Sequence, residues 1–257
     1  MARKPAAARR AEEGPETRPA RRASDRGRYG QLSRERVLAS ALELVDRESL
    51  SALSMRRLGT ELGVEAMALY RYAASKDALL DGLVEALYLE LEERLTIGPE
   101  AGSTDTAPAW RTELHRVARA TYDVCLAHPQ AVPLLTTRML AVPLARRPLA
   151  VLKDHERVLA LLREAGLDDA GTAAAFRAFT AWLLGYVSVE LRPMVDNPDE
   201  QDPAFRLGLH RMPPQELPGL REAAPALTEP GGPEGLAAGL DALLDRFGEI
   251  TGKQASA

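Results

Sequence analysis

Apolar residues recur along this chain with the spacing of α-helices, at steps of three and four residues, from residue 33 to near the end. The recurring positions mark the side of each helix that packs inward. Polar residues, glycines and prolines separate the segments and mark helix ends. The expected helices cover about residues 33–46, 54–63, 65–72, 75–95, 110–127, 134–140, 151–165, 168–191 and 236–250. We therefore predict an all-α fold.

The three short helices between residues 33 and 72 are the most informative part of this pattern. Ser33 can cap the first helix, and the second begins after Ser54. Gly63 can end the second helix, because glycine adopts the left-handed conformation without steric cost. Val64 returns to the core, and a third helix of about two turns follows. A helix, a glycine-containing turn and a short helix form a helix-turn-helix unit, whose last helix can enter a major groove.

Residues on and beside the third helix suit contact with DNA. Ala66, Met67 and Ala68 are small or flexible enough for the backbone to approach base edges. Side chains that can reach phosphates or bases on either side are those of Arg56, Tyr70, Arg71, Tyr72 and Lys76. A structural role is the alternative for each of them: Tyr72 can equally pack in the core, and Arg71 and Lys76 alone would be ordinary solvated charges. The spacing of the whole unit favours DNA binding.

The run SMRRLGTELGVEAMALYRY at residues 54–72, followed by SKDALLDGL at residues 75–83, resembles the DNA-binding region of the TetR family of bacterial transcriptional regulators, particularly the tetracycline repressor branch. The resemblance implies a DNA-facing set of Ser54, Met55, Arg56, Glu65, Ala66, Met67, Ala68, Tyr70, Arg71, Tyr72 and Lys76. It also implies that Arg56 reads a guanine and that Lys76 contacts the DNA backbone. Tetracycline repressors carry a polar residue, a proline and a threonine in place of Ala66, Met67 and Ala68, so we expect a different operator sequence.

We expect three parts along the chain. Residues 1–30 lack apolar periodicity and contain nine basic residues, which predicts a disordered basic arm that either follows the minor groove or is a passive extension. Residues 31–91 form the helix-turn-helix domain. The helix over residues 75–95, about 30 Å long at 1.5 Å per residue, then connects it to a helical effector-binding and dimerisation domain over residues 92–257.

The charge distribution agrees with this division. The net charge is −4, yet residues 1–80 contain 16 Lys or Arg against 11 Asp or Glu, while residues 81–257 contain 17 against 26. A positive head on an acidic body directs phosphate contact to the head. The single cysteine, Cys125, excludes an intrachain disulfide, and no run approaches the roughly 18 apolar residues that span a bilayer. We predict a cytoplasmic protein without membrane contact.

The two longest helices of the second domain carry large apolar residues around more of their circumference than one neighbour can cover. Across a twofold axis they would form a four-helix interface, and two heads about 34 Å apart would read a palindrome. The expected interface residues are Phe179, Trp182, Leu183, Tyr186, Leu240, Leu244 and Phe247. The resemblance implies the same homodimer, because GLAAGLDALLD at residues 235–245 is similar to the closing helix of tetracycline repressors, and Met212-Pro213-Pro214 precedes it as in theirs.

A ligand pocket is expected inside the second domain. Its candidate lining is His115, Tyr122, Cys125, Arg138, Met139, His155, Trp182 and Tyr186, although each can also be a core or surface residue. Tetracycline repressors hold the histidine that binds drug-chelated magnesium at the place of Leu135, and leucine offers no lone pair to a metal. We expect no metal or cofactor, and a small apolar or aromatic effector in place of magnesium-tetracycline.

These features favour a DNA-binding transcriptional regulator, a homodimeric repressor released from a palindromic operator by an effector. One alternative is a constitutive DNA-binding protein without an effector. The least favoured is a small helical enzyme with Cys125 as nucleophile and His128 as base, because His128 precedes a proline and no third orienting group or glycine-rich oxyanion loop accompanies the pair.

Overall fold

The computed structural model of the chain describes residues 32–97, 108–196 and 216–254, together with positions 202, 208, 211 and 213. Its helices are α2 (Arg34–Glu48), α3 (Met55–Leu62), α4 (Ala66–Leu69), α5 (Lys76–Ile97), α6 (Ala109–Ala127), α7 (Val132–Ala141), α8 (Leu149–Glu164), α9 (Asp169–Asp196), α11 (Pro218–Thr228) and α12 (Gly232–Gln254). Short 3-10 turns are η1 (Leu50–Ala52), η2 (Pro129–Ala131) and η3 (Leu144–Arg146). The described residues contain no strand, and the all-α prediction is confirmed. The predicted arm over residues 1–30 and Met212 lie outside the described residues.

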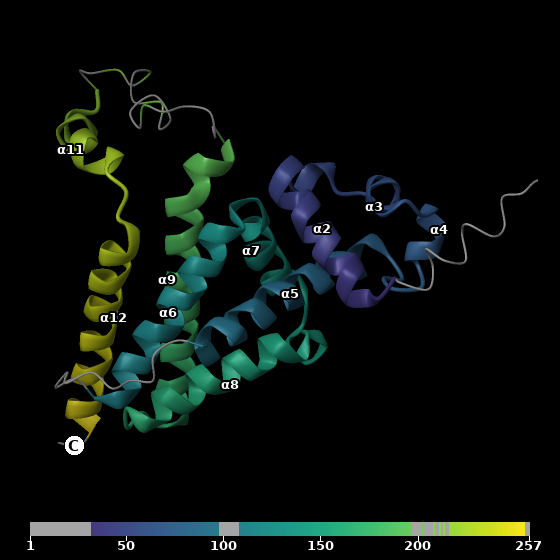
Figure 1. Cartoon of the computed structure of the whole chain (residues 1–257). Helices are drawn as coiled ribbons and strands as arrows, with labels where there is room; N and C mark the ends of the chain where they lie inside the picture. Colours follow the sequence, from purple (N-terminus) through teal and green to yellow (C-terminus); the bar gives the residue numbers. More distant parts are fainter. Residues whose placement is uncertain are drawn as a thin grey trace, which may run out of the picture.

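Helices α2 to α4 form a small head at one end of the molecule, and α6 to α12 form the body (Figure 1). The helix ends of the head follow local chemistry. Ser33 Oγ accepts a hydrogen bond from the Arg36 amide at 3.1 Å and so caps α2, and Ser54 Oγ caps α3 in the same way. Gly63 ends α3 in the left-handed conformation at φ 66°, as its sequence position predicts.

Helices α3 and α4 pack very closely at Gly59. A Cβ atom built on Gly59 would lie 2.9 Å from the Val64 carbonyl oxygen and 3.2 Å from the Ala66 amide nitrogen. Both neighbours are backbone atoms, so they cannot move aside as the end of a side chain could. Glycine at this position therefore allows the turn between the two helices to bring α4 against α3.

Helix α5 runs from the head into the middle of the body (Figure 1). Near its beginning, Leu79 and Leu83 are fully buried where α5 packs on α2, and further along Leu87 and Leu91 are buried among α6 and α8. One continuous cluster of buried apolar residues extends from α2 through α5 to α12. Head and body are therefore joined by a shared core along α5.

Helix α9 is longer than the sequence pattern predicts. The expected end at Arg192-Pro193 is wrong, because α9 continues to Asp196. Proline removes the hydrogen bond to the carbonyl four residues earlier, that of Val189. The Val189 side chain is 74% exposed, so water has access to this turn and can replace the lost bond. The proline-rich stretch that follows contains one helix, α11.

The apolar stripes of α9 and α12 pack against each other within one chain. Residues of the predicted dimer interface take part in this packing. Leu240 and Leu244 have no exposed surface, Trp182 lies directly over Gly239, and the Tyr186 hydroxyl donates a hydrogen bond to the Gly232 carbonyl at 2.7 Å. Phe179, Leu183 and Phe247 are also buried in the protomer, whereas Trp182 and Tyr186 are half-buried.

Within the described ranges, no helix combines the length and the apolar character needed to cross a membrane.

Candidate DNA interface and effector site

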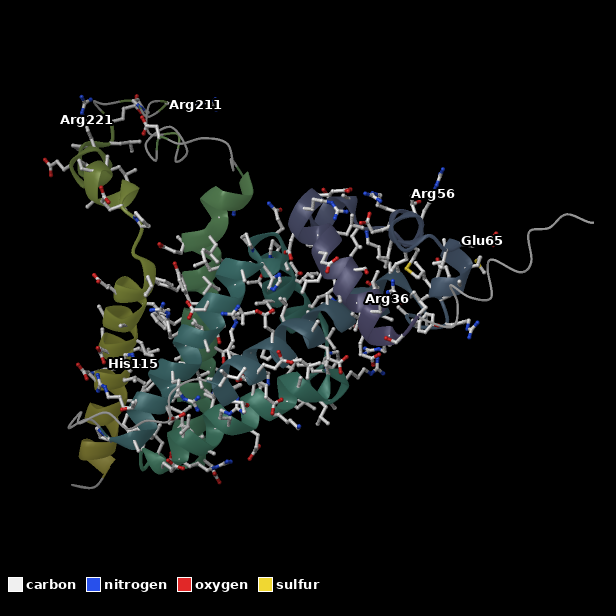
Figure 2. All side chains as sticks on the ribbon, viewed as in Figure 1. Arg36, Arg56, Glu65, His115, Arg211 and Arg221 are labelled. Atoms are coloured by element: carbon white, nitrogen blue, oxygen red, sulfur yellow. The ribbon has the colours of Figure 1, made fainter. Side chains whose placement is uncertain are left out.

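The far end of the head presents most of the predicted DNA-facing residues to solvent. Figure 2 shows Arg56 and Glu65 directed away from the body. Met67 is 73% exposed and Tyr70 44% exposed, although both are large and largely apolar. Other members of the set at this surface are Ser54, Arg71 and Lys76, which are exposed, and Ala66 and Ala68, which are half-buried. An exposed apolar side chain among cations on one face is a feature of a binding surface.

Two of the predicted DNA-facing side chains have internal roles instead. Met55 is only 8% exposed and belongs to the core, because it starts the α3 stripe that packs inward. The Tyr72 hydroxyl donates a hydrogen bond to the Leu32 carbonyl at 2.8 Å, which ties the turn after α4 to the start of α2. Ser54 is exposed, but its hydroxyl caps α3 by accepting from the Arg57 amide at 3.1 Å.

A cluster of charged residues links α2 to α3 within the head. It was not predicted from the sequence. Arg57 donates hydrogen bonds to both carboxylate oxygens of Glu48 and, at 3.1 Å, to Glu61. Arg47 lies 3.1 Å from the same Glu61 carboxylate. The hydrogen bonds from Arg57 lower the pKa of Glu48. Arg57 and Glu61 are four residues apart in α3, a spacing visible in the sequence, whereas the link to Glu48 required the fold.

His128 connects the head with the body. Its Nδ1 atom lies 2.7 Å from Asp46 Oδ2 on α2, and its Nε2 atom lies 2.8 Å from Glu90 Oε2 on α5. The hydrogen bond to Asp46, followed by that to Glu90, raises the pKa of His128 against the opposing effect of burial. The three residues are far apart in the sequence, so no local spacing signals this bridge.

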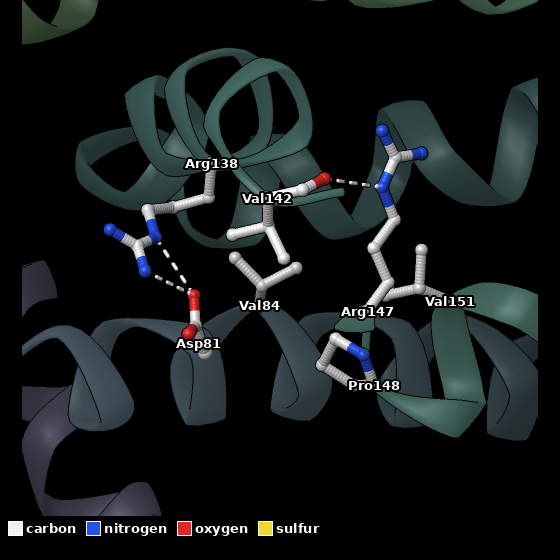
Figure 3. A pocket seen from close by; sticks show the side chains of 7 residues that line it. All are labelled: Asp81, Val84, Arg138, Val142, Arg147, Pro148 and Val151. Atoms are coloured by element: carbon white, nitrogen blue, oxygen red, sulfur yellow. Dashed lines mark hydrogen bonds and ion pairs between the residues drawn. The ribbon is translucent and has the colours of Figure 1, made fainter. Parts of the chain in front are cut away.

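Arg138, predicted in the ligand pocket, fastens α7 to α5 instead. Its guanidinium lies 2.6 Å from an oxygen of Asp81 and 3.1 Å from one of Asp77 (Figure 3 shows the Asp81 contact). Beside this contact, the Arg147 Nε atom donates to the Val142 carbonyl at 3.2 Å. The hollow between these groups measures about 10 Å³, and two of the charged groups that line it, Asp81 and Arg138, already pair with each other.

Most of the other predicted pocket residues are also used elsewhere. His115 Nε2 lies 2.9 Å from Asp241 Oδ1 on α12. Tyr122 packs near Tyr186, with ring centroids 6.4 Å apart, and Trp182 and Tyr186 lie against α12. Cys125 is buried, and burial raises the pKa of its thiol to about 12. The Met139 side chain lies outside the described residues, and Leu135 is buried in the core.

A cavity of about 20 Å³ lies between α5, α6, α8 and α9. Among the predicted pocket residues only His155 lines it. The full lining is Tyr88, Val117, Thr121, Asp154, His155, Val158, Phe176, Phe179, Thr180, Leu183 and Leu184. Its walls are mainly apolar and aromatic, with titratable Asp154 and His155 from α8 and hydroxyl groups from the other helices, which is the composition of a small-molecule site. Sequence reasoning missed Asp154 because an aspartate beside a histidine in an amphipathic helix is normally solvated.

Two protein-family models match this chain, one over the head and one over the body. Residues 37–83 match the family described as bacterial regulatory proteins, tetR family, and residues 104–245 match the tetracyclin repressor-like C-terminal domain. The second match alone covers more than half of the chain, over the α6 to α12 body. This chain belongs to the TetR family. The resemblance found in the sequences of the head and of the closing helix is thereby confirmed for this TetR-family protein.

Curated relatives of this TetR-family chain are named as transcriptional regulators. An HTH-type transcriptional regulator of Saccharopolyspora erythraea is 33% identical over 159 residues, which are 62% of this chain and 61% of that protein. The HTH-type transcriptional repressor DrrR1 of Streptomyces coeruleorubidus is 31% identical over 170 residues, which are 66% of this chain and 58% of that protein. The matched part thus spans about three fifths of the length of these relatives.

Solved structures of the family share the fold. The Streptomyces coelicolor TetR family protein ActR, in complex with actinorhodin, matches with a TM-score of 0.62 and 25% identity over 84% of this chain and 95% of that chain. BioQ with its natural double-stranded DNA operator matches with a TM-score of 0.52 and 28% identity over 70% of this chain and 94% of that chain.

Proposed function

We propose that this TetR-family protein is a homodimeric transcriptional repressor that binds a palindromic DNA operator and is released from it by a small-molecule effector. The names of the relatives support regulation of transcription, including repression. Related folds have been solved with an operator duplex and with a small molecule, which supports both kinds of partner. The protein acts where its DNA is, in the cytoplasm.

The observation that carries this proposal is the exposed face at the far end of the head. Arg56 at the start of α3, Met67 of α4 and Arg71 after α4 are all exposed, and Met67 is 73% exposed although it is apolar. In this arrangement α4 enters the major groove, Met67 approaches the bases and Arg56 pairs with a guanine. Lys76 opens α5, whose first turn is capped by Ser75 Oγ accepting from the Ala78 amide at 3.0 Å, and its exposed ammonium group suits a DNA phosphate.

The outward face of α9 and α12 suits a second copy of the chain. On α9 Ala181, Gly185 and Val189 are exposed at a spacing of four between the exposed Arg177 and Arg192, and on α12 Ala238 and Ala242 are exposed at the same spacing. Small residues allow two helix pairs to approach closely across a twofold axis. They take the place of the predicted interface residues that are buried within the protomer, whereas the half-buried Trp182 and Tyr186 can still contribute to the dimer contact.

Helix α5 gives the effector a route to the DNA-binding face. Tyr88 of α5 lines the cavity, Glu90 one half-turn later accepts a hydrogen bond from His128, and Asp81 nearer the head binds Arg138. An effector that widens the cavity displaces α5 and changes the spacing of the two heads. A coupling of roughly 1–3 kcal/mol is enough to change operator occupancy 5- to 150-fold.

Selection of bound duplexes from a random DNA library tests the proposal, first without and then with candidate small molecules. A palindromic consensus that is lost with one of the small molecules is the expected result. Recovery of random duplexes only, at low salt and without effector, contradicts the proposal. A consensus that persists with every molecule favours the constitutive DNA-binding alternative.

The enzyme alternative receives no support from the geometry of its two residues. The Cys125 thiol has a pKa of about 12, so it is protonated at neutral pH and a poor nucleophile. Both ring nitrogens of His128 face carboxylates of Asp46 and Glu90, so the imidazole has no free nitrogen to accept a proton from the thiol.

A further inference from the structure

The cavity between α5, α6, α8 and α9 contains polar atoms that this fold leaves unpaired. His155 of α8 is only 6% exposed, and neither of its ring nitrogens has a hydrogen-bond partner. The neighbouring Asp154 also lines the cavity, and its Oδ1 atom is buried without a partner. Because folded proteins pair nearly all such atoms, these groups are suited to a partner that is not part of this chain.

The charge states of Asp154 and His155 determine whether a ligand must donate or accept hydrogen bonds here. Burial raises the pKa of Asp154 to about 6, with Arg157 acting in the opposite direction, so the carboxylate is mostly ionised at neutral pH. Burial lowers the pKa of His155 to about 4, and the positive charge of Arg147 adds to the effect. A neutral imidazole has one N–H donor and one acceptor nitrogen. The polar wall therefore presents a carboxylate oxygen and an imidazole nitrogen as acceptors.

Charge complementarity on this wall favours a cation. Asp154 carries the one formal charge among the residues that line the cavity. Its counter-charge, Arg157 Nη1, lies 3.8 Å from Oδ1, which is too far for a hydrogen bond, and Glu92 adds a second negative charge nearby. A carboxylate with this little compensation gains most from a ligand that brings both positive charge and N–H donors.

The remaining walls suit an apolar body attached to that cation. Phe176 and Phe179 of α9 face the cavity together with Val158 and Leu183, and the Phe176 ring meets the His155 ring edge-on at 5.1 Å. Aromatic rings attract cations to their faces and stack against flat apolar groups. The cavity of about 20 Å³ has room for about one water molecule, so a larger ligand has to push these side chains outward.

We propose that this cavity binds an organic ammonium ion with an aromatic or bulky apolar body, whose N–H groups donate to Asp154 Oδ1 and to the acceptor nitrogen of His155. This inference rests on the proposed function, because it names the chemical class of the effector. An anionic ligand of the same shape would bring a like charge to Asp154. A neutral alcohol would supply one donor and no charge.

Three probes with one naphthalene ring separate these cases: 1-naphthylmethylammonium, 1-naphthalenemethanol and 1-naphthoate. Their dissociation constants for the full-length protein are measured by calorimetry near neutral pH. The ammonium ion should bind at least about tenfold more tightly than the alcohol, and the carboxylate should bind most weakly.

Asp154→Asn tests the role of the carboxylate. It keeps the shape of the side chain and should remove most of the difference in affinity between the ammonium ion and the alcohol. Asp169→Asn is the matched control, because that side chain is 99% exposed at the start of α9.

Histidine nitrogen NMR of the unaltered protein gives a second measurement that does not depend on a variant. The ammonium probe should shift the ring nitrogen signals of His155, and the carboxylate probe should leave them in place.

The inference is overturned by any of four results. These are equal binding of the three probes, tighter binding of the carboxylate, no binding of the ammonium ion, and a preference for the ammonium ion that survives Asp154→Asn. Duplex selection without probes is scored separately, so a protein that binds an operator but not the ammonium ion refutes this inference alone. Binding of the ammonium ion without any duplex preference refutes the proposed function alone.

Discussion

Nδ1 of His128 lies 2.7 Å from Oδ2 of Asp46, and this contact spans from the end of α6 to the first helix of the head. The other ring nitrogen faces a second carboxylate, that of Glu90, at 2.8 Å. A carboxylate can only accept, so both nitrogens must carry hydrogen for both bonds to form, and the bridge is complete only in the imidazolium form. One proton therefore strengthens the contact between the head and the body.

Stability should consequently depend on pH through His128. Its folded pKa is raised by Asp46 and Glu90, so the stabilisation is fully present below the unfolded pKa of about 6.5 and is lost as pH rises through the higher folded value. Urea unfolding of the native protein and of His128→Gln, measured across this range, should show the larger difference at the acidic end. A difference that is constant with pH contradicts an imidazolium bridge.

Replacement of Gly59 by alanine should loosen the head. The new Cβ would lie 2.9 Å from the Val64 carbonyl oxygen, so α3 and α4 must separate, at a cost of about 1–3 kcal/mol in the free energy of unfolding. Operator affinity, measured by fluorescence anisotropy, should fall with it. Gly219→Ala is the matched control, since nothing lies within 4 Å of a Cβ there, and its stability should be unchanged or slightly raised. An unchanged melting temperature for Gly59→Ala would show that the turn tolerates the methyl group.

Much of the head was predictable because its signals are local. The caps at Ser33 and Ser54 and the left-handed Gly63 involve residues within one turn of one another. The helical order of the body was predictable for the same reason, since apolar periodicity reports the buried face of each helix.

The partners of each buried face could not be predicted from periodicity. Trp182 and Leu240 belong to strongly apolar stripes, and the pattern alone does not distinguish a stripe that meets α12 of its own chain from one that meets another protomer. The candidate effector site was missed for a related reason. The polar atoms of His155 became informative only when the fold left them buried and unpaired.

Base recognition by Arg56 and phosphate contact by Lys76 should be separable once an operator is known. Arg56→Ala should cost about 1–3 kcal/mol of binding free energy and relax the preference at one base pair, whereas Lys76→Ala should weaken all duplexes alike and reduce the salt dependence by about one unit of slope. Binding titrations against single-base operator variants at several salt concentrations measure both effects. Arg163→Ala, an exposed arginine of α8 in the body, is the control and should change neither. If Arg56→Ala keeps both affinity and base preference, the arginine is only a solvated charge.

A charged residue at Val189 should separate the two protomers. Val189 is 74% exposed within the chain, so Val189→Arg should alter the stability of the protomer by less than about 0.5 kcal/mol. Across a twofold axis, however, the substitution places two cations in an apolar contact between α9 helices. Sedimentation velocity should then report monomers. Leu144→Arg, at a position 58% exposed in η3 and away from α9, should remain dimeric.

The loss of the dimer should also be visible in DNA binding, because each head contacts only one half-site. Two linked heads bind with an affinity about 10²- to 10⁴-fold above that of one, and Val189→Arg should lose this gain while its head stays folded. Affinity for a duplex with a single half-site should be the same in the native protein and the variant. If Val189→Arg stays dimeric and keeps full operator affinity, the protomers meet through a face other than the exposed side of α9.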